Sequence, residues 1–189
     1  MYAPCRSVKY NNQNLKELQI FNTYEEQQEL LNLIHKNKKR NYGGGDCLWY
    51  SFLQSGIFSP GIHCPNDART ETAVLILAEH TRPESYLKQL VNKKDLDKYL
   101  NKINTSNNWT QGIDKIGFEL IFYTLSGIYN TCIVLIINNG KMNITKIYNK
   151  LSRKRIFLYL SSEHYEFCNC NDDSFLQQIS INNFETIMP

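Results

Sequence analysis

The stretch NYGGGDCLWYSF, residues 41–52, decides the fold because it joins a glycine loop to a helix that begins at a cysteine. The apolar and small residues at 48, 51, 52 and 55 keep helical spacing, and Gly56 is typical of a helix C-terminus. Asp46 directly precedes the cysteine and belongs to the residue types that cap helices. We therefore expect a short helix that starts at Cys47, with Asp46 as its N-cap.

This position gives Cys47 a chemical interpretation. A thiol at a helix N-terminus feels the positive end of the helix dipole, which favours a thiolate. Glycines ahead of it allow backbone N–H groups to turn inward, where they can stabilise a tetrahedral oxyanion. Gly44, Gly45, Asp46 and Cys47 thus have the parts of an acyl-transfer site. A buried apolar cysteine that opens a core helix is the alternative interpretation.

A cysteine nucleophile needs a base, and His164 is the histidine that lies in a strand-like segment, FLYLSSEHYEFC. Alternate residues of a strand share a face, so His164 and Glu166 project to one side, and Tyr165 and Phe167 face the core. A carboxylate at Glu166 can accept the second ring N–H of His164 and fix its tautomer. An edge-strand histidine beside an exposed acid is the alternative.

Composition bounds the class of protein. The 189 residues are 42% apolar and 21% charged, which fits one soluble domain over 1–189 with its core at about 23–171. A net charge of +3 is too small to indicate nucleic acid, and no apolar run is long enough to span a membrane. The N-terminus lacks the apolar core of a signal peptide, so we expect reduced thiols and a cytoplasmic protein. The basic run at 36–40 is a solvated helix end or a patch for an acidic partner.

Helical patterns come first along the chain and strand patterns last. Helices are predicted at 23–37, at 68–81, once or twice within 83–103, and at 114–130. Strands are predicted at 131–139, 143–149, 155–163 and 164–170, with a hairpin turn at 138–140. This order favours an α+β fold with a small, mostly antiparallel sheet.

Two other site chemistries fit the residues poorly. Cys168 and Cys170 with His164 lack the spacing and the second ligand pair of a zinc site. The glycine loop lacks the lysine and hydroxyl of a Walker phosphate loop, and an acid stands there instead. We therefore expect no metal and no bound phosphate.

Taken in order, these motifs resemble the ovarian-tumour (OTU) family of cysteine deubiquitinases. The family's nucleophile motif, Asp-Gly-Asn/Asp-Cys-Leu-aromatic, is matched over 45–49. Trp109, and Glu119 with Leu120, match a tryptophan loop and the helix after it, and 164–166 looks like the C-terminal His-Tyr/Phe-Asp/Asn motif. The resemblance implies a papain-like OTU fold: helices around a small, mostly antiparallel sheet, with the nucleophile at a helix N-terminus.

The resemblance also implies roles for particular residues. Cys47, His164 and Glu166 would be catalytic, the loop of Gly44, Gly45 and Asp46 would hold the oxyanion, and Trp49, Trp109 and Tyr165 would line the substrate channel. Core packing is the alternative for both tryptophans. The implied partner is ubiquitin or polyubiquitin, and no metal or cofactor is implied. The protein would be a monomer in the cytoplasm, or in the host cytosol if it is an effector.

Two residues depart from the family pattern. Gly44 replaces the first aspartate of the nucleophile motif, and Glu166 replaces an aspartate or asparagine. The tail offers other groups to orient His164, namely Asn169, Asp172 and Asp173. These departures keep two alternatives open: a catalytically weak ubiquitin-binding module, and a cysteine protease for another ubiquitin-like modifier.

Overall fold

The computed structural model describes residues 28, 32, 34–41, 45–105, 115–138 and 143–169, with the backbone alone for 143–145. Its helices are α2 (Cys47–Ser55), α3 (Pro65–Thr81), α4 (Leu87–Leu90), α5 (Lys93–Asn104) and α6 (Lys115–Ile128). Its strands are β1 (Lys38–Lys39), β2 (Thr131–Asn138), β3 (Asn143–Tyr148), β4 (Lys154–Ser161) and β5 (His164–Cys168).

The strands form one five-stranded sheet in the order β1-β5-β4-β2-β3. β2 and β4 are parallel, whereas the pairs β1/β5, β4/β5 and β2/β3 are antiparallel. The α+β class and the mostly antiparallel sheet predicted from the sequence are thus confirmed. The parallel pair arises because the chain leaves β3 and returns along the other side of β2.

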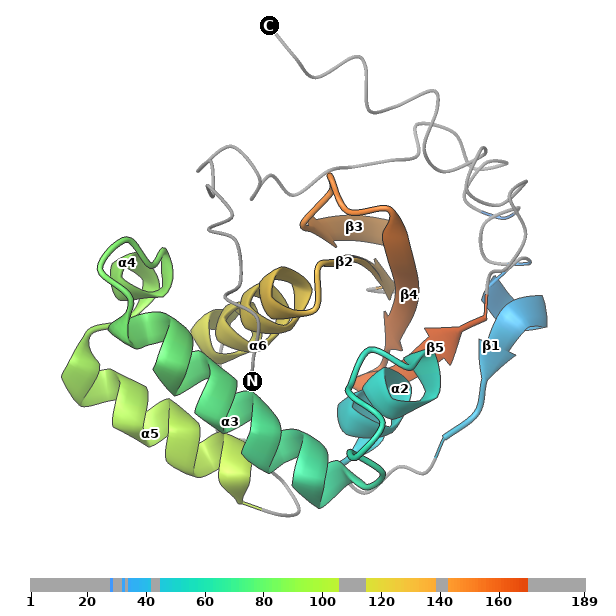
Figure 1. Ribbon diagram of the computed structural model, residues 1–189. Helices are drawn as coiled ribbons and strands as arrows, with labels where there is room; N and C mark the ends of the chain where they lie inside the picture. Colours follow the sequence, from blue (N-terminus) through green and yellow to red (C-terminus); the bar gives the residue numbers. More distant parts are fainter. Residues whose placement is uncertain are drawn as a thin grey trace, which may run out of the picture.

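Helices cover one face of this sheet in two layers (Figure 1). α2 packs against β5 and α6 against β2, while α3 packs on α2 and α6 and carries α5 on its outer side. Aromatic rings fill the contact, with Phe122 stacked on Tyr148 and packed against Phe52 and Tyr165. This core fixes α2 and β5 side by side, and these two elements carry the candidate site.

The sequence prediction of a helix over 23–37 agrees with the described residues 28, 32 and 34–37, which are helical; its other residues lie outside the described chain. The interpretation of 36–40 as a solvated helix end is wrong for Lys38 and Lys39, which form β1. Lys38 pairs with a carboxylate of β5, and the Lys39 ammonium lies 5.7 Å from the centre of the Phe167 ring. Both lysine side chains therefore contact residues of β5.

Two helix boundaries also differ from the sequence prediction. α3 begins at Pro65, a residue favoured in the first turn, rather than after a cap at Asn66 or Asp67. Pro83 does not start a helix; α4 begins at Leu87 and is a single turn. Local capping residues therefore placed these helices only approximately.

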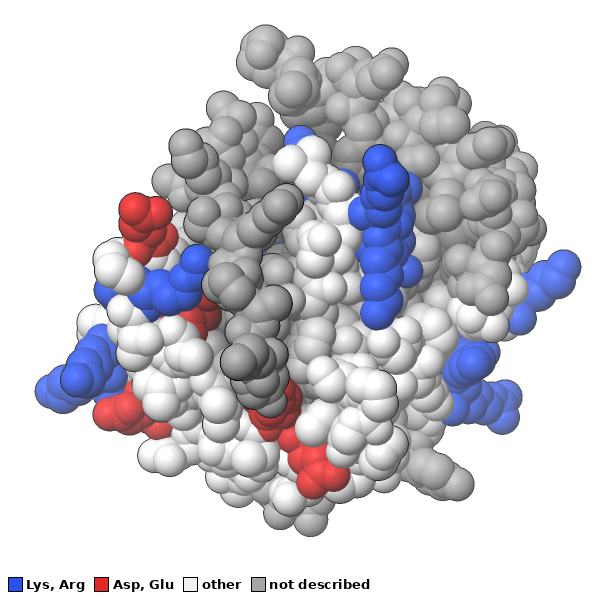
Figure 2. Space-filling model, in the orientation of Figure 1, with Lys and Arg blue, Asp and Glu red and all other residues white. Residues whose placement is uncertain are grey.

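Charge is unevenly spread over the face seen in Figure 2. The visible Asp and Glu side chains lie over the helical half, whereas Lys and Arg appear over both halves.

Among the described helices, none is long and apolar enough to cross a membrane.

Candidate functional site

Cys47 is the first residue of α2, as the sequence predicted, and only 4% of it is exposed. Its Sγ lies 4.0 Å from the backbone carbonyl oxygen of Glu163, a residue more than a hundred positions further along the chain. The fold therefore brings the thiol to the segment that contains His164.

His164 stands at the start of β5, where the chain reverses from β4. Ser161 and His164 are paired, so Ser162 and Glu163 form a two-residue loop, with φ values of 49° and 64°. Positive φ at both positions is the feature of a type I′ hairpin turn, which normally holds Asn-Gly. The turn directs the Glu163 carbonyl toward the thiol, and His164, the next residue, is half-buried.

Asp46 occupies the N-cap position of α2, but its side chain makes no capping hydrogen bond. Its carboxylate instead pairs with the guanidinium of Arg69, which lies in α3 and is 2% exposed. The sequence expectation of a capping aspartate is therefore corrected: the side chain ties the loop before Cys47 to the neighbouring helix. Gly45 precedes it with φ of 91°, a conformation that favours glycine.

Asn41 joins the nucleophile helix to the histidine strand. Its Nδ2 lies 3.0 Å from the Cys47 carbonyl oxygen, 2.8 Å from the Tyr165 carbonyl oxygen and 2.9 Å from Ser51 Oγ. The Ser51 hydroxyl in turn donates to the Cys47 carbonyl at 2.8 Å. One side chain thus binds the backbone of both the nucleophile and the residue after His164.

Glu166 is buried on β5, and its Oε2 lies 2.8 Å from Lys38 Nζ on β1. The alternation of β5 places it on the same face as His164, as the sequence predicted. In the described chain its hydrogen-bond partner is this lysine. Asn169, another candidate to orient His164, is exposed, and its backbone N–H donates to the carbonyl of Asn37; Asp172 and Asp173 lie outside the described residues.

The other predicted site residues lie in the core or outside the described chain. Trp49 is fully buried and packs near Phe52, and Tyr165 is buried near Phe118 and Phe122. Both positions favour the core-packing interpretation. Gly44 and Trp109 lie outside the described residues.

Tyr165 and Glu119 are buried ionisable residues that interact electrostatically, and Tyr165 also interacts with Cys47. Burial raises the pKa of Tyr165 well above its ordinary value, and electrostatic interaction with Cys47 and Glu119 raises it further. Glu119 accepts from Lys146 Nζ at 3.1 Å and from Tyr148 Oη at 3.2 Å. The phenol therefore stays neutral beside the nucleophile.

The other described cysteines have different environments. Cys132 is buried in β2, which raises the pKa of its thiol to about 11 despite the nearby charge of Arg155. Cys168 is buried in β5 and Cys64 is exposed before α3, and all three are free thiols. In the part of the chain that the structure describes, no group of His, Cys, Asp and Glu is arranged to hold a metal ion.

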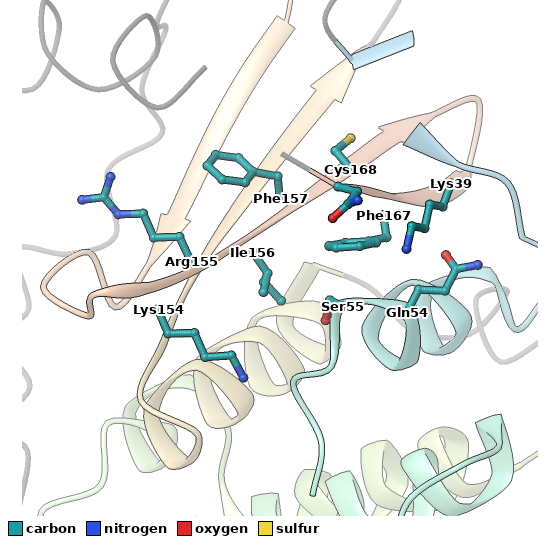
Figure 3. A pocket seen from close by; sticks show the side chains of 10 residues that line it. Lys39, Gln54, Ser55, Lys154, Arg155, Ile156, Phe157, Phe167 and Cys168 are labelled. Carbon is teal, nitrogen blue, oxygen red and sulfur yellow. The ribbon is translucent and has the colours of Figure 1, made fainter. Parts of the chain in front are cut away.

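A hollow of about 190 Å³ lies at the opposite end of α2 from the thiol (Figure 3). Gln54 and Ser55 at the end of α2, Phe167 of β5, and the lysines Lys39 and Lys154 line it. Lys154 Nζ donates to the Gly56 carbonyl at 3.0 Å, and Lys39 lies over Phe167. Because these contacts explain both lysines, we assign this hollow no ligand.

Sequence reasoning missed Asn41 and Arg69. Arg69 is a cation at a buried position of a predicted core helix, a pattern that signals a buried partner. Asn41 carries no comparable signal, because both of its backbone partners depend on tertiary structure. The sequence found the thiol and the strand, but not the side chains that hold them together.

The fold is similar to that of solved OTU domains. The structure of the OTU domain of OTUD1 matches with a TM-score of 0.53 and 17% identity, over 76% of this chain and 95% of that one. An OTU deubiquitinase from Wolbachia pipientis wMel matches with a TM-score of 0.46 and 16% identity, over 75% of this chain and 94% of that one. No family model matches the sequence, and no curated protein does. The first likeness shows that the chain has an OTU-like fold.

Proposed function

We propose that this protein is a thiol-dependent deubiquitinase that cleaves ubiquitin from lysine side chains or from polyubiquitin chains. The observation that carries the proposal is the contact of the Cys47 thiol, at the N-terminus of α2, with the carbonyl of Glu163, the residue before His164, in an OTU-like fold. The proposed partner is ubiquitin, bound by a monomer in the cytoplasm.

In the proposed reaction, the Cys47 thiolate forms a bond to the carbonyl carbon of the C-terminal glycine of ubiquitin. The bond from that carbon to the lysine Nζ breaks, and His164 transfers the thiol proton to the leaving amine. Water then attacks the thioester, His164 accepts its proton, and ubiquitin leaves with a free carboxylate. The backbone N–H of Cys47 and those of the Gly44–Asp46 loop are proposed to bind the oxyanion.

Glu166 is our candidate to orient the His164 imidazole, because the two share a face of β5. Lys38 occupies one carboxylate oxygen, Oε2, and the second oxygen is available to the imidazole in this proposal. Glu166→Gln keeps the size of the side chain and removes its charge. We expect it to lower the cleavage rate and shift the pH profile, whereas Glu84→Gln, the same change at an exposed carboxylate, leaves the profile in place.

The test uses ubiquitin that carries an electrophile at its C-terminus, together with a panel of di-ubiquitin linkages. The wild-type protein should form a covalent adduct and cleave at least one linkage, and Cys47→Ala should abolish both. His164→Ala should slow them by about 10²- to 10⁴-fold. Cys64→Ala is the matched control, because it removes the exposed thiol that precedes α3. Cleavage by Cys47→Ala would overturn the assignment.

A second candidate is a ubiquitin-binding module with weak or no catalysis. It is favoured by the ion pair that occupies Glu166 and by the shielding of the Cys47 thiol. Saturable ubiquitin binding by a wild-type protein that never reacts with the probe would support this candidate over the first. Adducts with other modifiers alone would instead indicate a protease for another ubiquitin-like protein.

A further inference from the structure

Asn41 lies at the end of a segment that is fixed at several points to both elements of the site. We call residues 37–41 the strap. The Asn37 carbonyl accepts from the Asn169 N–H at 3.0 Å, and Lys38 pairs with Glu166. The Arg40 carbonyl accepts from Gln54 Nε2 at 3.2 Å. The Asn37 and Lys38 contacts hold the strap along β5 and bring Asn41 to the thiol end of α2, whereas the Gln54 contact is solvent-exposed.

The hydrogen bonds of Asn41 fix the orientation of its amide. The Cys47 and Tyr165 carbonyls are acceptors only, and Ser51 already donates its hydroxyl hydrogen to the Cys47 carbonyl. These three oxygens are acceptors toward Asn41, so the amide nitrogen and not the amide oxygen faces them, with its two hydrogens shared among the three. Removing this donor leaves the carbonyls of the nucleophile and of Tyr165 without the group that bridges them.

We propose that Asn41 is a positioning residue that sets the distance between the Cys47 thiol and the His164 imidazole. This inference rests on the proposed roles of those two residues. The Cys47 carbonyl and the Tyr165 carbonyl belong to the two backbone segments that carry the reacting side chains, and Asn41 Nδ2 bridges them over 3.0 Å and 2.8 Å. Proton transfer from a thiol needs near hydrogen-bond distance, so a displacement of about 1 Å costs on the order of 10²-fold in rate.

The experiment compares two neutral substitutions that nearly keep the size of the side chain. Each removes one amide donor, the first from the strap itself and the second from a residue that binds the strap. Asn41→Leu removes the donor at the thiol end of α2, and Gln54→Met removes the amide donor to Arg40 at the other end. Alkylation of Cys47 by iodoacetamide is followed against pH by mass spectrometry of the peptide that contains it. Reaction with the ubiquitin probe and thermal unfolding are measured in parallel, all at least 10 °C below the lowest unfolding midpoint.

We expect Asn41→Leu to slow the probe reaction by about 10- to 100-fold and to move the midpoint of the Cys47 alkylation curve to higher pH. Gln54→Met should leave the rate within about twofold and the midpoint unchanged. A merely structural role for Asn41 would lower the unfolding temperature without moving the alkylation midpoint. Asn41→Leu with wild-type rates and an unchanged midpoint would overturn the proposal. If Asn41→Leu does not fold, Asn41→Ala takes its place with the same expectations.

The alkylation readout separates this inference from the proposed function, because it needs no ubiquitin. If the wild type ignores the ubiquitin probe but Asn41→Leu still moves the alkylation midpoint, the positioning role stands and the proposed substrate falls. If wild type and variant alkylate alike at every pH while the probe reacts, the deubiquitinase stands and the positioning role falls.

Discussion

The two ends of α2 are built differently. At the C-terminal end, Gly56 adopts a left-handed conformation and its N–H bonds back to the Leu53 carbonyl, while Lys154 covers the carbonyl of Gly56. At the N-terminal end, Asp46 and Cys47 are held by Arg69, Asn41 and the β4–β5 turn. The first end is closed mainly by neighbours in sequence, and the second by Asn41 of the preceding loop together with two segments distant in sequence, α3 and the β4–β5 turn.

This contrast separates two structural tasks, ending the helix at its C-terminus and orienting the Cys47 side chain at its N-terminus. A glycine and one exposed lysine suffice to satisfy helix carbonyls. Aiming the thiol needs buried polar groups, and buried polar groups are costly when a partner is lost. We therefore expect mutations at the thiol end to have large effects and mutations at the other end to have small ones.

The largest effect is expected for Arg69→Ala. It leaves the Asp46 carboxylate partly buried without its cation, which typically costs about 3–5 kcal/mol of unfolding free energy. Denaturant unfolding measures the loss, and the probe reaction should slow because the loop before Cys47 loosens. Lys98→Ala is the control: both side chains of its ion pair with Asp95 are largely exposed, so its loss should change the unfolding free energy little. Equal losses in the two variants would contradict the contrast.

The next effect concerns alkaline pH. Burial raises the pKa of Cys132 from 9.0 to about 11 and raises that of Tyr165 above 10.0. The unfolded chain therefore loses these protons at a lower pH than the folded protein does. The stability that the two protonated groups contribute is complete below pH 9 and falls as the pH rises. Between pH 9 and 11, Cys132 alone should account for a fall of about 2–3 kcal/mol.

One variant of each residue assigns the loss of unfolding free energy to Cys132 or to Tyr165. Cys132→Val should flatten the unfolding free energy between pH 9 and 11, and Tyr165→Phe should flatten it above pH 10. Urea unfolding at fixed pH values measures both slopes. A wild-type slope in either variant would show that its ionisation does not contribute.

A smaller effect is expected at the β4–β5 turn. Ser162 and Glu163 adopt positive φ without being glycine or asparagine, whereas the other two described non-glycine residues with positive φ, Asn130 and Asn149, are asparagines. Ser162→Asn combined with Glu163→Gly supplies the preferred turn sequence and should stabilise the protein by about 1 kcal/mol, or 2–4 °C in midpoint. Calorimetry measures the gain; a lower midpoint would contradict the strained-turn account.

The smallest effect is expected at the far end of α2. Lys154→Met removes one exposed donor from the helix C-terminus and should cost about 0.5 kcal/mol or less, with no change in the Cys47 alkylation curve. A change in that curve would show that the two ends of α2 are coupled.

Local patterns predicted much of the fold. The start of α2 at Cys47, its stop at Gly56, and β2 to β5 followed from helical spacing, a glycine and runs of β-branched residues. β1 was missed because two lysines have no strand propensity of their own; they pair with β5 through partners far away in sequence. The same reason applies to the parallel pairing of β2 with β4, which no turn signal encodes.

The candidate site was predictable to the same extent. The positions of Cys47 and His164 in their elements followed from local pattern. The partner of Asp46 did not, because a carboxylate at an N-cap position favours the local amide in any sequence argument. The Lys38 partner of Glu166 was likewise hidden, since it depends on the register of β1 against β5.

The separation between Asn41 and Tyr165 in the chain has a consequence for biosynthesis. The nucleophile helix leaves the ribosome before β5 has been made, and domains fold only as their segments emerge. The nascent chain therefore carries Cys47 without the Tyr165 carbonyl that completes its bridge. Closing so long a loop is among the slower steps of folding. Reactivity of the thiol should thus arise late, after translation has passed the last strand of the sheet.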